Sequence, residues 1–179
     1  MLWPIIVPSA VLGIFAVMPS DAAKAQESGQ WFGKGVIVAT VNKSVAAQDA
    51  PDHSLMLFEC DGAVVNAEGK AFLDKARYQL VGLVDSAVGG HGYKTFTEAD
   101  GSKVFAKYTV TEAKLPDILG KFEFTGGTGK YTGITGSGDF HVVMLSDVTQ
   151  YDELHGHYTI PMAATGSSTP PSTAGKTAE

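Results

Sequence analysis

The chain has 179 residues, which favours a single domain that can bury a core without disulfide or metal staples. Apolar residues make up 44% and charged residues 18%, and the 21 glycines are typical of a turn-rich globular protein. The 13 Lys and Arg against 19 Asp and Glu give a net charge of −6. This balance argues against a nucleic-acid partner and against a basic patch for anionic lipid, because both need clustered positive charge.

The first 25 residues resemble a cleaved signal peptide. Residues 2–18 are almost entirely apolar, and Ala23-Lys24-Ala25 offers the small-x-small pattern of a signal-peptidase site, with Gln26 as the new N-terminus. The stretch departs from the usual pattern because no Lys or Arg precedes Trp3. A retained membrane anchor and a buried helix are the alternatives, but the run is short for a span and is broken by prolines. We expect export to the periplasm or the medium, with no stable membrane span after cleavage.

The other end of the chain and the single cysteine add two expectations. Residues 163–179 are rich in Ser, Thr, Pro, Gly and Ala without apolar periodicity, which predicts a disordered tail and leaves 26–162 as the folded domain. Cys60 is the only cysteine, so no disulfide can form within the chain. We expect its thiol to be buried within a strand, with pairing between chains as the alternative.

The sequence of the folded domain predicts a series of short strands. Runs rich in β-branched and aromatic residues alternate with turn signals, and no segment shows a clear helical stripe. Asp100-Gly101 between two alternating runs is a strong hairpin signal, and Asp61-Gly62, 66–70 and Gly89-Gly90 are further expected turns. The expected strands cover 34–42, 54–60, 77–84, 93–98, 103–110, the two arms of a glycine-rich segment within 121–141, and 155–160. About eight strands at even spacing predict an all-β antiparallel barrel or sandwich.

The glycine-rich segment from Lys121 to His141 admits two interpretations. A Walker A phosphate loop needs Ser or Thr after Gly129-Lys130, where this chain has Tyr131, and a Gly at position 124, where it has Phe. The dinucleotide-binding fingerprint fails as well, and the helix that should follow would contain several glycines. A tight β-turn or barrel corner accounts for more of the pattern, because two-residue alternation places Phe122 and Phe124 on one face.

Two segments resemble a known group of proteins. Gly92-Tyr-Lys-Thr-Phe-Thr-Glu-Ala-Asp-Gly-Ser102 and Gly126-Gly-Thr-Gly-Lys-Tyr-Thr-Gly-Ile-Thr-Gly-Ser-Gly138 are similar to segments of small exported bacterial proteins. That group resembles the allene oxide cyclase-like barrels, which include the plant dirigent proteins. The resemblance implies an eight-stranded barrel, often a homotrimer, whose lumen holds a small hydrophobic or aromatic molecule. No catalytic motif of that superfamily matches this chain.

Several polar and aromatic side chains are candidates for a lumenal site. Glu59 lies in an otherwise apolar strand, and a desolvated carboxylate has a raised pKa suited to acid–base chemistry near neutral pH. We name Glu59, His141 and Tyr158 as candidate catalytic residues. Strand register decides which side chains face inward, because a slip by one residue reverses every face. The candidate ligand-binding aromatics are Tyr78, Tyr93, Phe105 and Tyr108.

Other chemistry has little support in the sequence. His155 and His157 share a strand face and would make a workable pair of zinc ligands, but two solvent-facing histidines are the commoner case. We expect no metal and no cofactor. The chain has no Gly-x-Ser-x-Gly elbow, and Cys60 lies in mid-strand instead of at a helix start, so hydrolase chemistry is disfavoured.

Three functions remain open from the sequence. The first is a binding module that holds a small hydrophobic or aromatic molecule in the lumen. The second is a cyclase or isomerase that performs acid–base chemistry in the same cavity. The third is a structural protein with a filled barrel that works by oligomerisation. The fold alone does not decide among them.

Overall fold

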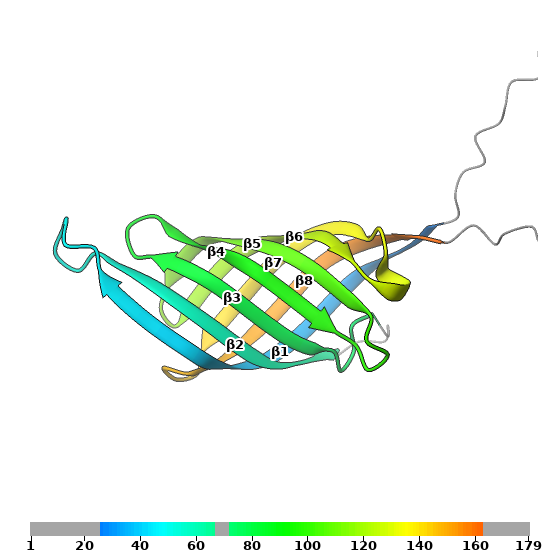
Figure 1. Ribbon diagram of the computed structural model, residues 1–179, viewed down its shortest axis with the longest axis horizontal. Coiled ribbons are helices and arrows are strands. Elements are labelled where there is room, and N and C mark those ends of the chain that lie inside the picture. The colour runs from blue at the N-terminus through cyan, green and yellow to red at the C-terminus, as the bar shows by residue number, and fades with distance from the viewer. Residues whose placement is uncertain (1–25, 67–71, 163–179) are drawn as a thin grey trace, which may run out of the picture.

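Eight antiparallel strands close into one barrel in the computed structural model, which describes residues 26–66 and 72–162. Each strand pairs with the next, and β1 pairs with β8, so the sheet has no free edge (Figure 1). This confirms the all-β expectation and decides for the barrel over the sandwich. The strands are β1 Gln26–Ala46, β2 Ser54–Asn66, β3 Arg77–Asp85, β4 Gly89–Thr97, β5 Lys103–Lys114, β6 Asp117–Gly127, β7 Thr135–Met144 and β8 Thr149–Pro161.

Alternation along the strands sorts the side chains into a lumen and an outer face. In β4, for example, Gly90, Gly92, Lys94 and Phe96 are buried, whereas the residues between them are exposed or half-buried. The same period of two runs through β3, β5 and β6. A side chain's place inside or outside the barrel therefore follows from its position in the register.

Three of the expected turns can be compared with the structure. The one expected at Gly89-Gly90 is displaced, because the β3–β4 turn covers 86–88 and β4 begins at Gly89. Asp100-Gly101 joins β4 to β5, and Gly101 has a φ of +82° that suits glycine. The turn expected at Asp61-Gly62 is wrong, because β2 continues through it and pairs with β1 on one side and β3 on the other. A Cβ on Gly62 would lie 2.0 Å from the backbone oxygen of Val36, so this glycine permits close approach of β1 instead of reversing the chain.

The glycine-rich segment forms a hairpin, as the β interpretation predicted. β6 and β7 are joined by a short 3-10 helix, η1 Gly129–Tyr131. Tyr131 and Lys130 both bond to the carboxylate of Glu98, which fastens this hairpin to the end of β4. The described residues include no α-helix of the length and apolarity that a bilayer span requires. The expected signal peptide and tail, and most of the turn at 66–70, lie outside the described residues.

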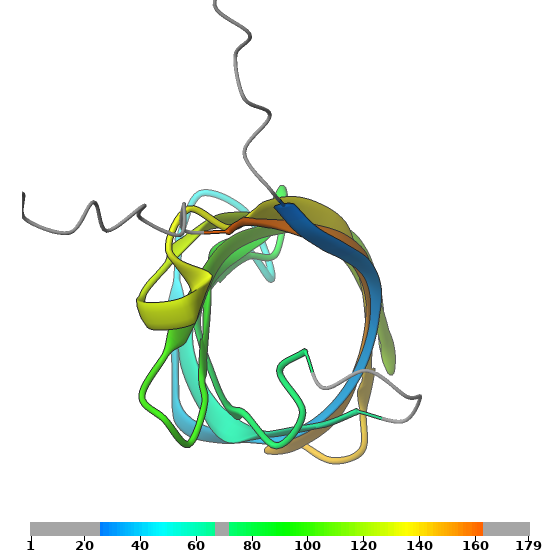
Figure 2. The ribbon, with the colours of Figure 1, turned by 90° about the vertical axis from the view of Figure 1, so that its right-hand side faces the viewer.

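One end of the barrel is filled by aromatic side chains, which we call the aromatic plug. At this end, where β1 begins and β8 finishes, residues 72–76 turn inward across the ring of strands (Figure 2). Trp31 packs edge-on against Phe72 and Phe96, each with ring centroids 5.5 Å apart, and Phe72 stacks on Tyr158 at 4.0 Å. The plug consists of Trp31, Phe72, Phe96, Phe122, Phe124, Tyr131 and Tyr158, all buried.

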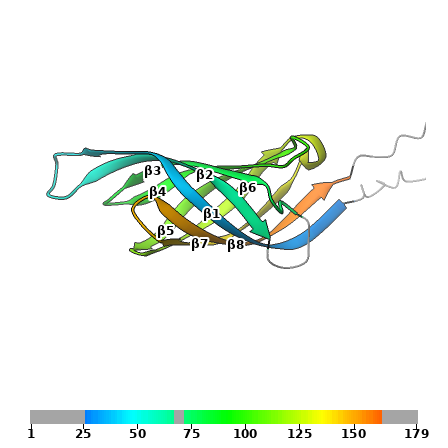
Figure 3. The same ribbon diagram turned by 90° about the horizontal axis from the view of Figure 1, so that it is seen from below.

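The opposite end carries the four remaining hairpin turns, which follow β1, β3, β5 and β7. The β1–β2 hairpin projects beyond the other turns there, as the views from the side and from below both show (Figures 1 and 3). The turns between β3 and β4, β5 and β6, and β7 and β8 surround the same end. The barrel is thus closed at the plug, and its remaining space lies toward these turns.

Candidate functional site

A cavity of about 550 Å³ occupies the end of the lumen opposite the plug. It lies between the inner faces of β2 to β8 and reaches the turns after β3 and β5. Its volume falls within the range of about 300–1,000 Å³ that is typical of small-molecule sites. The apolar lining includes Met56, Phe58, Leu80, Val110, Ile118, Phe140 and Val142.

Lys94 brings a charged group into this apolar space. Its side chain is only 2% exposed, and it lines the cavity from β4. The Lys94 Nζ lies 4.2 Å from the centroid of the Phe140 ring and 5.4 Å from that of Tyr108, so aromatic faces solvate the amine where water does not reach. A lysine this deeply buried is rare unless it is paired.

A hydrogen-bonded chain connects Lys94 to two further buried groups, and we call these three residues the lumenal triad. Lys94 Nζ donates to the Tyr78 hydroxyl at 2.6 Å, and that hydroxyl donates to Asp152 Oδ2 at 2.7 Å. The amine also lies 3.5 Å from Asp152 Oδ2. Tyr78 and Asp152 are completely buried. The triad draws on β3, β4 and β8, so only the closed barrel brings its members together.

Burial shifts the acid–base properties of the triad toward its uncharged forms. It lowers the pKa of Lys94, although the Asp152 carboxylate acts in the opposite direction. It raises the pKa of Asp152 against the pull of the Lys94 amine, and raises the pKa of Tyr78 well above its usual value. These directions favour proton sharing between the amine and the carboxyl group through the Tyr78 hydroxyl, and groups shifted in this way are common at functional sites.

Two polar atoms, one in the triad and one on the neighbouring Tyr108, are buried without a partner. Within the described part of the chain, no protein group bonds to the Tyr108 hydroxyl or to Asp152 Oδ1. Tyr108 lines the cavity, and its pKa is raised by burial. A Cβ on Gly82 would lie 2.0 Å from the Tyr108 oxygen, so the glycine makes room for this hydroxyl. An unpaired buried hydroxyl is costly, and a bound molecule with a polar group would relieve that cost.

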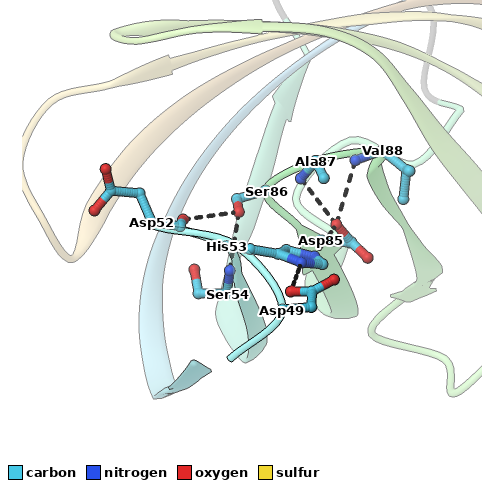
Figure 4. A network of polar contacts seen from close by, with 8 residues as sticks. All are labelled: Asp49, Asp52, His53, Ser54, Asp85, Ser86, Ala87 and Val88. Carbon is cyan, nitrogen blue, oxygen red and sulfur yellow. Dashed lines mark hydrogen bonds and ion pairs between the residues drawn. The ribbon is translucent and has the colours of Figure 1, made fainter. Parts of the chain in front are cut away.

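A second polar network stands at the rim of the cavity. His53, in the β1–β2 turn, contacts Asp49 through Nδ1 at 2.5 Å and Asp85 through Nε2 at 3.0 Å (Figure 4). Asp85 also accepts hydrogen bonds from the backbone N–H groups of Ala87 and Val88. The carboxylates raise the pKa of His53, so its protonated form ties the β1–β2 turn to the β3–β4 turn.

Three of the predicted site residues point into the barrel. Tyr108 is buried and lines the cavity, whereas Tyr78 is buried in the barrel interior as a member of the triad. Tyr158 is also buried, but it stacks on Phe72 in the aromatic plug, away from the cavity lining. Tyr158 therefore has a packing role at the closed end.

The other predicted site residues lie on the outer face. Glu59 is exposed on β2, and His141 is half-exposed and bonded to Asp117 at 2.7 Å. Tyr93 is 64% exposed, and Phe105 lies on the same outer side between inward-facing neighbours. The expectation that these four side chains reach the lumen is wrong. Glu59 does share a face with Leu55 and Leu57, but that whole face is the outside of the barrel.

The histidine pair of β8 also faces outward. His155 and His157 are both exposed, as expected for two solvent-facing residues. Residues 26–66 and 72–162 contain no group of three or more His, Cys, Asp or Glu side chains placed to hold a metal ion. Cys60 is buried in β2, which confirms its expected place, and burial raises the pKa of its thiol to about 11.

The sequence reasoning missed Lys94 and Asp152. Lysine and aspartate are usually exposed, so the exposed aromatic Tyr93 was preferred as the inward residue of its strand. A signal was present, because Lys94 shares a face with Phe96 and Asp152 shares one with Leu154. If the strand face that carries the large apolar residue is taken as the inner face, Lys94 and Asp152 are both placed inside the barrel.

Comparison with known proteins supports the fold and leaves the activity open. No family model matches the chain, and no curated protein matches it either. Among solved structures, a pterocarpan synthase dirigent protein has a similar fold, with a TM-score of 0.51 and 11% sequence identity. The match covers 78% of this chain and 93% of that one. The chain therefore has the dirigent-like barrel fold, in agreement with the resemblance noted in its sequence.

Proposed function

We propose that this barrel binds a small apolar or aromatic molecule in its lumen. The observation that carries the proposal is the cavity of about 550 Å³ at the open end. An engineered apolar cavity of about 150 Å³ is enough to bind benzene, so this space suits a molecule of two or three rings. A mostly apolar wall with a few convergent polar groups is the usual composition of such sites.

Two neighbouring valines of β7 provide a matched test. Val142 lines the cavity, whereas Val143 lies on the outer side of the same strand. The full chain is titrated with N-phenyl-1-naphthylamine, a neutral probe whose fluorescence rises in apolar surroundings. Val142→Trp fills the cavity and should weaken binding at least tenfold, whereas Val143→Trp should leave it within about twofold of the wild type. Circular dichroism verifies that both variants fold. Equal affinities for the two variants would refute lumenal binding.

A second function, acid–base catalysis in the same cavity, is favoured by the lumenal triad. Lys94, Tyr78 and Asp152 offer connected proton donors and acceptors beside an apolar space. The dirigent protein of similar fold is named as a synthase. We propose that any cyclase or isomerase activity of this chain uses the triad in place of Glu59 and His141. Such an activity would be lost in Tyr78→Phe and kept in Glu59→Gln.

Self-association is a further proposal, supported by the outer face. Six apolar side chains gather over β1 to β4: Val45, Leu55, Leu57, Val81, Leu83 and Tyr93, and we call them the outer strip. Leu57 pairs with Leu83 in the register, and Val81 pairs with Tyr93. A contiguous exposed apolar patch is typical of an interface, and a homotrimer is our proposed state. Light scattering after size exclusion should show a trimer for the wild type and a monomer for Leu57→Glu/Leu83→Glu.

We also propose that the protein is exported and that its signal peptide is cleaved. The apolar N-terminal segment and the Ala23-Lys24-Ala25 sequence support cleavage before Gln26. N-terminal sequencing of the protein recovered from its native source should read Gln26-Glu27-Ser28. Recovery of a chain that retains residues 1–25 would contradict cleavage.

A further inference from the structure

We propose that Lys94 forms an imine with the carbonyl carbon of an apolar or aromatic aldehyde or ketone bound in the lumen. The inference rests on the proposed function and specifies its ligand class. Lys94 is the one amine that lines the cavity among the described residues, and its Nζ lies against aromatic rings with almost no solvent contact. Imine formation needs a neutral amine beside a proton donor, and the triad provides that arrangement.

The geometry of the triad suits proton transfer at the attacking nitrogen. The neutral Lys94 nitrogen attacks the carbonyl carbon, so a C–N bond forms as the π bond of the carbonyl breaks. The nitrogen then gives a proton to the Tyr78 hydroxyl and Asp152 chain, and the former carbonyl oxygen takes up a proton to give a carbinolamine. Loss of that hydroxyl as water then leaves the C=N bond, so the balance is amine plus carbonyl giving imine plus water, with no oxidant or reductant. Tyr78 lies 2.6 Å from the amine and 2.7 Å from Asp152 Oδ2, so it can pass protons between them.

The surroundings of Lys94 favour its neutral form. Burial lowers its pKa, whereas an exposed lysine with a pKa near 10.4 has only about 1 neutral amine in 2,500 at pH 7. Each unit by which the pKa of Lys94 falls raises its neutral fraction about tenfold. The apolar wall selects the carbonyl compound, and Tyr108, whose hydroxyl has no protein partner, also lines the cavity.

Reductive trapping tests the proposal. The full chain is incubated at pH 7 with cinnamaldehyde and sodium cyanoborohydride, which reduces an imine to a stable secondary amine. Trypsin does not cleave after the alkylated lysine, so modification of Lys94 appears as peptide 78–103 carrying one addition. We expect Lys94 to carry at least about ten times the modification of an average exposed lysine, with the excess largest near neutral pH and fading toward pH 10.

Four variants complete the test. Lys94→Met and Lys94→Arg should lose the addition, whereas Lys107→Met, on the outer face of β5, should keep it. Lys94→Arg retains a positive charge but has no amine that can form an imine. Binding of N-phenyl-1-naphthylamine by this variant shows that the lumen remains folded. Tyr78→Phe should slow trapping at Lys94 at least tenfold and flatten its pH profile while the neutral probe still binds.

Two results would overturn the proposal. The first is a wild-type protein that binds the neutral probe but shows no excess at Lys94, and this result leaves lumenal binding intact. In that case, binding of the anion cinnamate distinguishes the other role of Lys94. If cinnamate binding is lost in Lys94→Met and kept in Lys94→Arg, the residue provides a positive charge for an anion and is not a nucleophile. The second is a wild-type protein that binds neither the probe nor the aldehyde, which overturns the proposed function as well.

Discussion

Removing the charges of Lys94 and Asp152, singly and together, tests whether they act as one buried unit. Lys94→Met leaves the Asp152 carboxylate without its cation, and Asp152→Asn leaves the Lys94 amine without its anion. Breaking one side of a buried ion pair usually costs 3–5 kcal/mol. We expect about 3 kcal/mol for each variant, because the remaining group can lose its charge through its shifted pKa. The asparagine still offers the Tyr78 hydroxyl an acceptor.

The double variant gives the decisive comparison. Independent effects would sum to about 6 kcal/mol, whereas a coupled pair predicts a loss of only about 1–2 kcal/mol, mostly from imperfect hydrogen bonding in the apolar site. Urea denaturation, followed by the fluorescence of buried Trp31, measures the free energy of unfolding of all four proteins. A double variant that loses close to the sum would refute the pairing, and with it the triad as a proton-sharing unit.

Two further predictions concern the lining and the rim of the cavity. Gly82→Ala places a methyl group against the Tyr108 hydroxyl. We expect the affinity for N-phenyl-1-naphthylamine to fall at least fivefold, because Tyr108 must shift within the cavity wall. An unchanged affinity in a folded variant would contradict the described packing. Asp49 and Asp85 raise the pKa of His53 in the folded protein. The protonated imidazole therefore stabilises the fold fully below the pKa of about 6.5 that histidine has in the unfolded chain. This stabilisation is lost as the pH rises through the higher pKa of the folded protein. The difference in melting temperature between the wild type and His53→Gln should therefore shrink from pH 5.5 to pH 8.5, and a difference that grows would contradict this assignment.

Much of the architecture was predictable because it depends on local signals. Two-residue alternation identified the strands, and Asp100-Gly101 marked a true hairpin turn, since glycine there has a positive φ. Asp61-Gly62 has the same residue types within a continuous strand. What distinguishes the two is close contact with a neighbouring strand, and no local pattern encodes that contact.

The candidate site was predicted less well, because it depends on which face of each strand turns inward. Tyr78 and Tyr108 do point into the barrel, whereas Glu59 and His141 lie on its outer face. The triad joins three strands, and β8 meets β1 only when the barrel closes. The local sequence pattern gives the face of each residue on its own strand. It does not show that Lys94 and Asp152 lie close enough to pair.

The central claim, that the lumen at the open end is a binding site, is tested most directly by locating a ligand there. Crystals of the full chain soaked with 4-bromobenzaldehyde allow the bromine to be placed by anomalous scattering. We predict a bromine peak inside the barrel among Val110, Ile118 and Phe140, with the carbonyl end toward Lys94. A peak confined to the outer face, or a lumen with no bromine at saturating concentration, would contradict the account.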